Sequence, residues 1–278
     1  MLTSTPPTWP ASALDQALAR SRGQHRAALG LYLPVGYPTR SVCLEALHAM
    51  APYCDVLELG VPYRRAHLDG PTIQHAAVQA LDAGSFRMRD LFTTTAALAS
   101  STSTALVAMT YWDPVQEYGP GLFAEEFAAA GGAGVLVPDL PDSAAAGWQR
   151  ATRAAGLHSI SFIPPHASDA RARAIGTSSS GMVYAPAAPG RTGTAGPLSP
   201  YLPRLVRRLR DATRLPVAVG IGISTPARAA QASAYADAVV VGSAVIRHMQ
   251  AAEDTPVAAA AAARGFAAGV RRMQWPAA

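Results

Sequence analysis

The chain of 278 residues is 50% hydrophobic and only 15% charged, which suits one large domain with a single core. No apolar run approaches the roughly 18 residues of a membrane span, and no basic start leads into an apolar stretch, so we expect a cytoplasmic protein. The formal net charge is +5, but the basic residues are scattered and do not alternate with stacking aromatics, so we expect no nucleic-acid partner.

Two residue types limit the possible chemistry. All 23 basic residues are Arg, and the absence of lysine excludes a Schiff-base aldolase and a lysine-anchored pyridoxal phosphate enzyme, because each needs an amine nucleophile. Cys43 and Cys54 are the only cysteines, which is too few for a disulfide framework and lacks the spacing of a zinc site. We therefore predict two reduced thiols, no metal and no cofactor, with any carbon chemistry performed by acids and bases.

The N-terminal part of the chain predicts a tail and then a helix. Residues 1–12 hold three prolines among serines and threonines, which predicts a flexible tail before the main domain at 13–278. A first helix is expected over Leu14–Arg22. The tail carries no functional motif.

Short apolar runs then recur with amphipathic stretches between them, which predicts strand-helix units and a parallel sheet. Eight strands are expected, at Leu29–Val35, Val56–Gly60, Ala105–Thr110, Gly134–Pro138, Ser159–Ile163, Met182–Ala185, Pro216–Gly220 and Ala238–Gly242. Helices are expected at Ser41–Met50, Thr72–Ala83, Phe123–Ala130, Ser143–Ala155, Ser168–Thr177, Tyr201–Ala212 and Pro226–Ala234.

Eight such units over about 250 residues are the number that closes a (β/α)8 barrel. A doubly wound open sheet alternates in the same way, but Gly, Pro or a polar residue follows nearly every predicted strand, which favours the barrel. We therefore predict a single α/β domain, a (β/α)8 TIM barrel with an extra N-terminal helix and a C-terminal Ala-rich helix. The last helix is expected to begin at Thr255-Pro256 and to continue through Ala258–Ala263, with Gly265 and Gly269 weakening its end.

An acid at the end of an apolar strand is the strongest functional signal. Glu58 lies in Leu57-Glu58-Leu59-Gly60-Val61-Pro62, and Asp69 follows eleven residues later in the next loop. Burial at a barrel mouth would raise the pKa of Glu58 and suit it to proton transfer near neutral pH. Asp69, in a more polar loop, would stay ionised and accept an N–H hydrogen bond. In the structural alternative, Glu58 pairs with an Arg and Asp69 caps the following helix.

Glycine-rich segments near the last strands indicate an anion site. They are Gly190-Arg191-Thr192-Gly193, Gly220-Ile221-Gly222 and Gly242-Ser243. In TIM barrels the loops after strands seven and eight commonly bind phosphate, because free N–H groups and a helix dipole favour an anion there. A dinucleotide motif is excluded because no third Gly follows at the needed spacing. His67 lies between the two acids, where it could contact the substrate, but we expect it to be a solvated loop residue.

The motifs from Leu29 to Met249 resemble the tryptophan synthase α subunit family. The most specific are Glu58-Leu59-Gly60-Val61-Pro62 and, at the family spacing, Asp69-Gly70-Pro71-Thr72-Ile73-Gln74. Supporting segments are Gly36-Tyr37-Pro38, Met109-Thr110-Tyr111-Trp112-Asp113-Pro114, Val137-Pro138-Asp139-Leu140-Pro141, Thr192-Gly193, Gly220-Ile221-Gly222-Ile223-Ser224 and Gly242-Ser243-Ala244.

The resemblance implies a lyase that cleaves indole-3-glycerol phosphate to indole and glyceraldehyde 3-phosphate without a cofactor. The catalytic residues would be Glu58 as general acid and base, Asp69 as acceptor of the indole N–H, and Tyr184 near the catalytic Glu. The substrate-binding residues would be Tyr32, Tyr111, Thr192, Gly193, Gly220, Gly222, Gly242 and Ser243. The resemblance also implies a phosphorylated indole as substrate and a β-type subunit as partner.

Three segments depart from the family pattern. Tyr63, Arg64, Arg65 and Ala66 replace Phe-Ser-Asp-Pro in the loop that closes over substrate and signals to the β subunit, and Asp113 replaces an Asn. Residues 187–191 replace Ser-Arg-x-Gly-Val in the mobile lid of loop six. Two alternatives therefore stay open.

The first alternative is a repurposed homologue in specialised metabolism that uses the same carboxylates on a related indole or aldol substrate. Arg64 and Arg65 would then bind an extra anionic group. The second alternative is a weakly catalytic subunit that regulates a β-type partner, and the presence of both carboxylates argues against it.

Overall fold

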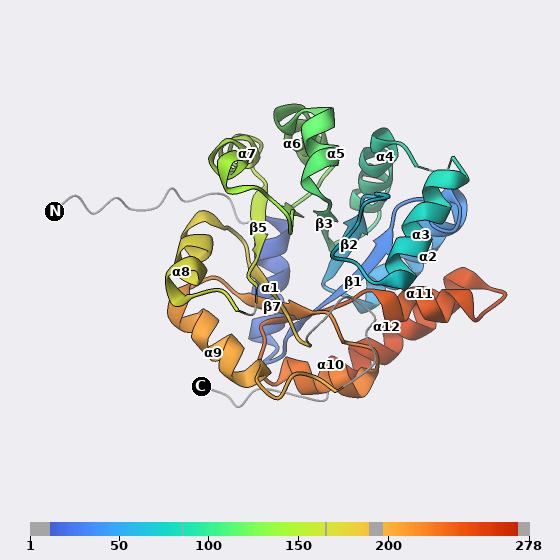
Figure 1. The fold of residues 1–278 in the computed structure, drawn as a ribbon. Coiled ribbons are helices and arrows are strands. Elements are labelled where there is room, and N and C mark those ends of the chain that lie inside the picture. Colours follow the sequence, from blue (N-terminus) through green and yellow to red (C-terminus); the bar gives the residue numbers. More distant parts are fainter. Residues whose placement is uncertain (1–11, 85, 165, 189–196, 272–278) are drawn as a thin grey trace.

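The computed structural model of the protein describes residues 12–84, 86–164, 166–188 and 197–271. Eight parallel strands form a closed barrel in sequence order, surrounded by helices (Figure 1). The strands are β1 (Ala28–Pro34), β2 (Val56–Gly60), β3 (Ala105–Met109), β4 (Gly134–Leu136), β5 (His158–Phe162), β6 (Val183–Pro186), β7 (Val217–Gly220) and β8 (Ala238–Val241).

The first helix precedes the first strand, and the other helices follow the strands around the outside of the barrel. They are α1 (Ala13–Gly23), α2 (Arg40–Met50), α3 (Pro71–Asp82), α4 (Met88–Ala99), α5 (Trp112–Tyr118), α6 (Pro120–Ala129), α7 (Asp142–Ala154), α8 (Asp169–Ser178), α9 (Leu202–Ala212), α10 (Pro226–Ser233), α11 (Ser243–Gln250) and α12 (Thr255–Arg271). A short 3-10 helix, η1 (Ala51–Tyr53), precedes β2. Among the described residues, no helix is long and apolar enough to cross a membrane.

The pairing of the first and last strands excludes an open sheet. β1 pairs with β8 in parallel, with Leu29 opposite Val239, so the predicted TIM barrel is confirmed. All eight predicted strands are present, with ends that differ by at most two residues. The division into a tail at 1–12 and a domain at 13–278 stays a prediction, since residues 1–11 lie outside the described ranges.

Local sequence signals explain where several helices begin. Ser12 and Asp15 form a capping box at the start of α1, and the hydroxyl of Thr225 accepts a hydrogen bond at the start of α10. Pro71 occupies the first position of α3, where its missing N–H costs no helical hydrogen bond.

The core has two layers. One lies between the strands and the outer helices, and the other fills the barrel interior. Leu14, Ala17 and Leu18 of α1 belong to the interior cluster, so the N-terminal helix closes one end of the barrel. The opposite end, where the strands terminate, is therefore the end that is free to hold a site.

Candidate active site

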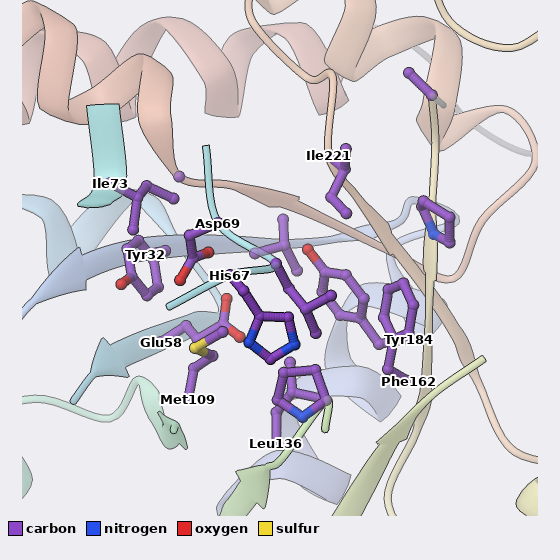
Figure 2. Close-up of a pocket in the computed structure, with 16 residues that line it drawn as sticks. Tyr32, Glu58, His67, Asp69, Ile73, Met109, Leu136, Phe162, Tyr184 and Ile221 are labelled. Atoms are coloured by element: carbon purple, nitrogen blue, oxygen red, sulfur yellow. The ribbon is translucent and has the colours of Figure 1, made fainter. Parts of the chain in front are cut away.

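A cavity of about 440 Å³ opens at the C-terminal end of the barrel (Figure 2). Most of the residues that line it come from strand ends and from the loops that follow. They are Tyr32, Glu58, His67, Leu68, Asp69, Ile73, Met109, Leu136, Pro138, Phe162, Tyr184, Pro186, Ala188, Ile221, Val240 and Gly242. The walls are mainly apolar, with both predicted carboxylates on one side (Figure 2).

Glu58 lies on β2 and is 6% exposed. Burial, and secondarily the charge of Asp69, raises its pKa to about 8. In the described part of the chain, no Arg pairs with this carboxylate and no side chain or backbone group forms a hydrogen bond with it. The ion pair of the structural alternative is therefore not formed by any described Arg, and Arg191 lies outside the described residues.

Asp69 lies in the loop between β2 and α3 and is also 6% exposed. Burial raises its pKa to about 6, while the Tyr111 hydroxyl and the nearby His67 act in the opposite direction. Tyr111 donates a hydrogen bond to Oδ2 of Asp69 at 3.1 Å. The N-cap of α3 is Gly70, without a side-chain hydrogen bond, so the expectation that Asp69 caps this helix is also wrong.

Two tyrosines enter the cavity because glycines on neighbouring strands leave room for them. A Cβ atom at Gly60 would overlap the ring of Tyr32, and one at Gly220 would overlap the hydroxyl of Tyr184. Burial and the charges of Asp69 and Glu58 raise the pKa of both phenols well above the usual range. Both therefore stay protonated near neutral pH and can donate hydrogen bonds.

The predicted anion-binding segments after β7 and β8 reach the same mouth. Ile221 and Gly222 have positive φ angles of 57° and 89°, and Ser243 is the first residue of α11, with Gly242 as its N-cap. Ile221 and Gly242 line the cavity, while Gly220, Gly222 and Ser243 lie beside them in sequence. Thr192, Gly193 and the rest of their glycine-rich segment lie outside the described residues.

Tyr111 has a different position from the one expected of a pocket aromatic. It is 1% exposed and contacts the loop through its hydroxyl, which accepts a hydrogen bond from the Leu68 N–H at 3.2 Å. Its link to the cavity is therefore through Asp69. His67, expected to be solvated, is exposed and also lines the cavity.

The apolar lining was not identified from the sequence. Ile73, Met109, Leu136, Phe162 and Val240 carry no motif, because apolar residues in strands and helices equally predict core packing. Four of the five lie within predicted strands, which was the one available signal, while Ile73 lies in the helix after β2. The ring centroids of Phe162 and Tyr184 lie 6.1 Å apart, so these two residues form one aromatic wall.

The two arginines of the divergent loop are paired within the chain. Arg64 pairs with Asp82, and Arg65 pairs with Asp113 at 2.8 Å. Neither pair lies in the cavity lining. Within the described ranges, no group of three or more His, Cys, Asp or Glu side chains is arranged to hold a metal ion.

The closed barrel and its two buried carboxylates at the C-terminal mouth define a (β/α)8 protein of the acid/base enzyme class. Residues 18–273 match the family model described as tryptophan synthase alpha chain. The chain belongs to this family.

Individual relatives agree with that assignment. The tryptophan synthase alpha chain of Acidothermus cellulolyticus is 43% identical over 264 residues, covering 94% of this chain and 98% of the relative. That of Thermobifida fusca is 40% identical, with the same coverage.

Solved structures agree as well. A chain of Mycobacterium tuberculosis tryptophan synthase superposes with a TM-score of 0.87 at 38% identity, covering 94% of this chain and 99% of that one. The tryptophan synthase subunit alpha of Legionella pneumophila superposes with a TM-score of 0.84 at 29% identity, covering 95% and 100%.

Proposed function

We propose that this protein is a lyase that cleaves indole-3-glycerol phosphate to indole and glyceraldehyde 3-phosphate by acid/base catalysis. The observation that carries the proposal is the pair Glu58 and Asp69, two buried carboxylates in one apolar cavity whose pKa values are raised to about 8 and about 6. Near neutral pH the first carries a proton and the second is ionised. One acid can therefore donate a proton while the other stabilises positive charge.

The first step protonates the ring. Glu58 gives its proton to C3 of the indole, which places positive charge on the ring nitrogen. The ionised Asp69 accepts the hydrogen bond of the ring N–H and stabilises that charge, since an anion acts strongly in a poorly solvated site. The Tyr111 hydroxyl keeps Asp69 in position for this contact.

The second step breaks the carbon–carbon bond. The Glu58 carboxylate takes the proton of the hydroxyl on the adjacent side-chain carbon, and that carbon becomes the aldehyde of glyceraldehyde 3-phosphate. The electrons of the broken bond return to the ring and restore neutral indole. Glu58 ends the cycle protonated, so no cofactor and no net proton are consumed.

The cavity walls suit the two halves of this substrate. Met109, Leu136 and Phe162 offer an apolar surface to the indole ring. Gly220, Gly222, Gly242 and Ser243 would hold the phosphate with backbone N–H groups and the N-terminus of α11, together with Thr192 and Gly193.

The tyrosines have separate roles in this proposal. Tyr184 would donate a hydrogen bond near Glu58, whose charge raises its pKa. Tyr32 would contact the ring from β1, where it lies opposite Glu58 in the strand register. Tyr111 would act on the substrate through Asp69.

A repurposed homologue with a different anionic substrate is less well supported. That reading relied on free arginines after β2, and both Arg64 and Arg65 already pair with carboxylates of the same chain. A weakly catalytic regulatory subunit is also less well supported, because it would not need two buried acids in an apolar cavity, where the charged form is disfavoured.

A β-type subunit is the partner that family membership suggests, and its binding to this chain is part of the proposal. The departures at Arg64, Arg65, Ala66 and Asp113 would alter the contact surface. Co-purification with a β-type subunit tests whether the two chains bind. A chain that stays monomeric in the presence of that subunit would contradict the proposed partnership. The expected cytoplasmic location stays a prediction.

The direct test of the activity is indole release by the purified chain. Indole-3-glycerol phosphate is supplied with and without a β-type subunit, and indole is quantified over time. We expect release in both cases. No release by the wild type in either condition would sink the proposed function.

A further inference from the structure

One carboxylate oxygen holds two residues of the loop between β2 and α3. Oδ2 of Asp113 accepts a hydrogen bond from the Tyr63 hydroxyl at 2.6 Å and pairs with Arg65 at 2.8 Å. The Arg65 guanidinium also lies over the Tyr63 ring, 5.5 Å from its centroid. Asp113 lies in the first turn of α5, after β3, so this contact joins two neighbouring units of the barrel mouth.

The same loop contacts the site through aromatic rings. The ring of Tyr111 lies 5.5 Å from that of Tyr63 and 5.5 Å from that of His67. The Tyr111 hydroxyl accepts a hydrogen bond from the Leu68 N–H and donates one to Asp69. A continuous series of contacts therefore runs from Asp113 through Tyr63 and Tyr111 to Asp69.

We propose that Asp113 is a positioning residue that anchors this loop through Tyr63 and Arg65, so that Tyr111 holds the Asp69 carboxylate toward the substrate. The whole series of contacts lies within one chain. The proposal rests on the proposed function only for its kinetic consequence. Its structural consequence is measured without substrate.

The exposed ion pair by itself is a weak anchor, since Arg65 and Asp113 have side chains that are 72% and 48% exposed. The Tyr63 hydrogen bond to the charged carboxylate is the stronger contact. Loss of that contact should release the loop, whereas loss of the ion pair alone should not. Variants that remove the Tyr63 hydrogen bond should therefore behave differently from variants that remove only an exposed ion pair.

The chain offers a matched control in Asp142. It also lies in the first turn of a helix, α7, and pairs with an arginine, Arg171, at 2.6 Å, with side chains that are 74% and 50% exposed. Replacing either aspartate by alanine removes an exposed ion pair and a first-turn charge. Only Asp113 contacts the loop that carries Asp69.

The first measurement is hydrogen exchange of the Leu68 amide and its loop in the substrate-free chain. Asp113→Ala and Tyr63→Phe should each speed exchange by roughly 10-fold, because the Tyr111 hydroxyl no longer protects that N–H. Asp142→Ala should leave it at the wild-type rate. Asp113→Asn should recover most of the protection, since its amide oxygen still accepts from Tyr63. Wild-type exchange in Asp113→Ala would overturn the proposal.

The second measurement is steady-state indole release. Asp113→Ala should lower kcat roughly 10-fold with little change in KM, because Asp69 acts most strongly when the ring becomes cationic. Asp113→Ala combined with Tyr63→Phe should be no worse than either alone, as expected for one shared contact. Independent, multiplying losses would contradict the proposal. Absence of indole release by the wild type would contradict the proposed function and leave the exchange result to decide this inference.

Discussion

Glu58 and Asp69 are equally buried but have different neighbours. Asp69 accepts a hydrogen bond from Tyr111, which favours its charged form, while Glu58 has no such donor in the described part of the chain. The pKa of Glu58 is therefore the higher, about 8 against about 6. In the proposed reaction, this separation would make Glu58 the proton donor and Asp69 the anion.

The rate of indole release should depend on both groups. We expect kcat/KM to be greatest near neutral pH and to fall below about pH 6, where Asp69 becomes protonated, and above about pH 8, where Glu58 loses its proton. A pH series with purified enzyme measures this directly. Constant activity from about pH 5 to about pH 9 would contradict the assignment.

Glu58 should also make stability depend on pH. Its folded pKa, about 8, is above the ordinary value of 4.5, so the folded state holds the proton more tightly than the unfolded state. The free energy of unfolding should therefore decline as pH rises from 4.5 to about 8 and level off at higher pH.

Glu58→Gln removes that ionisation. The variant should gain stability relative to the wild type as pH rises from about 5 to about 9, by on the order of 2–4 kcal/mol, because one pKa unit corresponds to about 1.4 kcal/mol. Any effect of the glutamine amide on the free energy of unfolding that does not depend on pH is the same at both pH values, so it does not affect this difference. Urea unfolding at the two pH values measures the change, and a constant difference between variant and wild type would argue against a buried, titrating Glu58.

At the scale of elements, close packing explains two glycines. Gly220 ends β7 where a Cβ atom would overlap the Tyr184 hydroxyl. Gly220→Ala should therefore displace Tyr184 and lower kcat roughly 10-fold or more. Gly121→Ala, in α6 where nothing lies within 4 Å, is the control and should keep full activity. Equal activity in both variants would show that the position of Tyr184 does not affect indole release.

The C-terminal helix gives a second comparison. A Cβ atom at Gly269 of α12 would overlap the carbonyl oxygen of Pro226 at the start of α10, whereas one at Gly265 would lie 3.6 Å from the Pro226 ring. Gly269→Ala should destabilise the protein by about 1–3 kcal/mol. Gly265→Ala should be neutral or mildly stabilising, because Ala favours the helix. Thermal unfolding compares the two, and equal melting temperatures would contradict this packing.

These elements also show where sequence reasoning succeeds. Apolar runs ending in Gly, Pro or polar residues located all eight strands, because strand burial and loop chemistry are local properties. α4 and α5 had no prediction, and α5 has only seven residues and follows β3 after a gap of two. From the sequence, Gly269 was expected only to weaken α12. Its contact with Pro226 depends on tertiary packing and could not be predicted.

At the scale of the whole molecule, contacts between residues distant in the chain could not be predicted from the sequence. The positions of Glu58 and Asp69 were anticipated, but two ion pairs were not. Arg64 pairs with Asp82 within the second unit of the barrel, and Arg65 pairs with Asp113 of the third. Under the first alternative, these arginines were instead expected to bind an extra anionic group. The hydrogen bonds of Tyr111 with Leu68 and Asp69 also could not be predicted, because they depend on how the loop between β2 and α3 folds.

The two ends of the barrel divide stability from chemistry. α1 fills the end at which the strands begin, and the cavity occupies the end at which they finish. This arrangement gives the carboxylates an apolar floor that excludes water and raises their pKa values. The activity proposed for the molecule depends on that burial.

The most direct test of this account is indole release by Glu58→Gln compared with the wild type at saturating indole-3-glycerol phosphate. We expect a loss of roughly 10³-fold or more in kcat, because the amide neither donates the ring proton nor takes the hydroxyl proton. Substrate binding, measured separately by calorimetry, should stay within about 3-fold. A variant that releases indole within about 2-fold of the wild-type rate would contradict it.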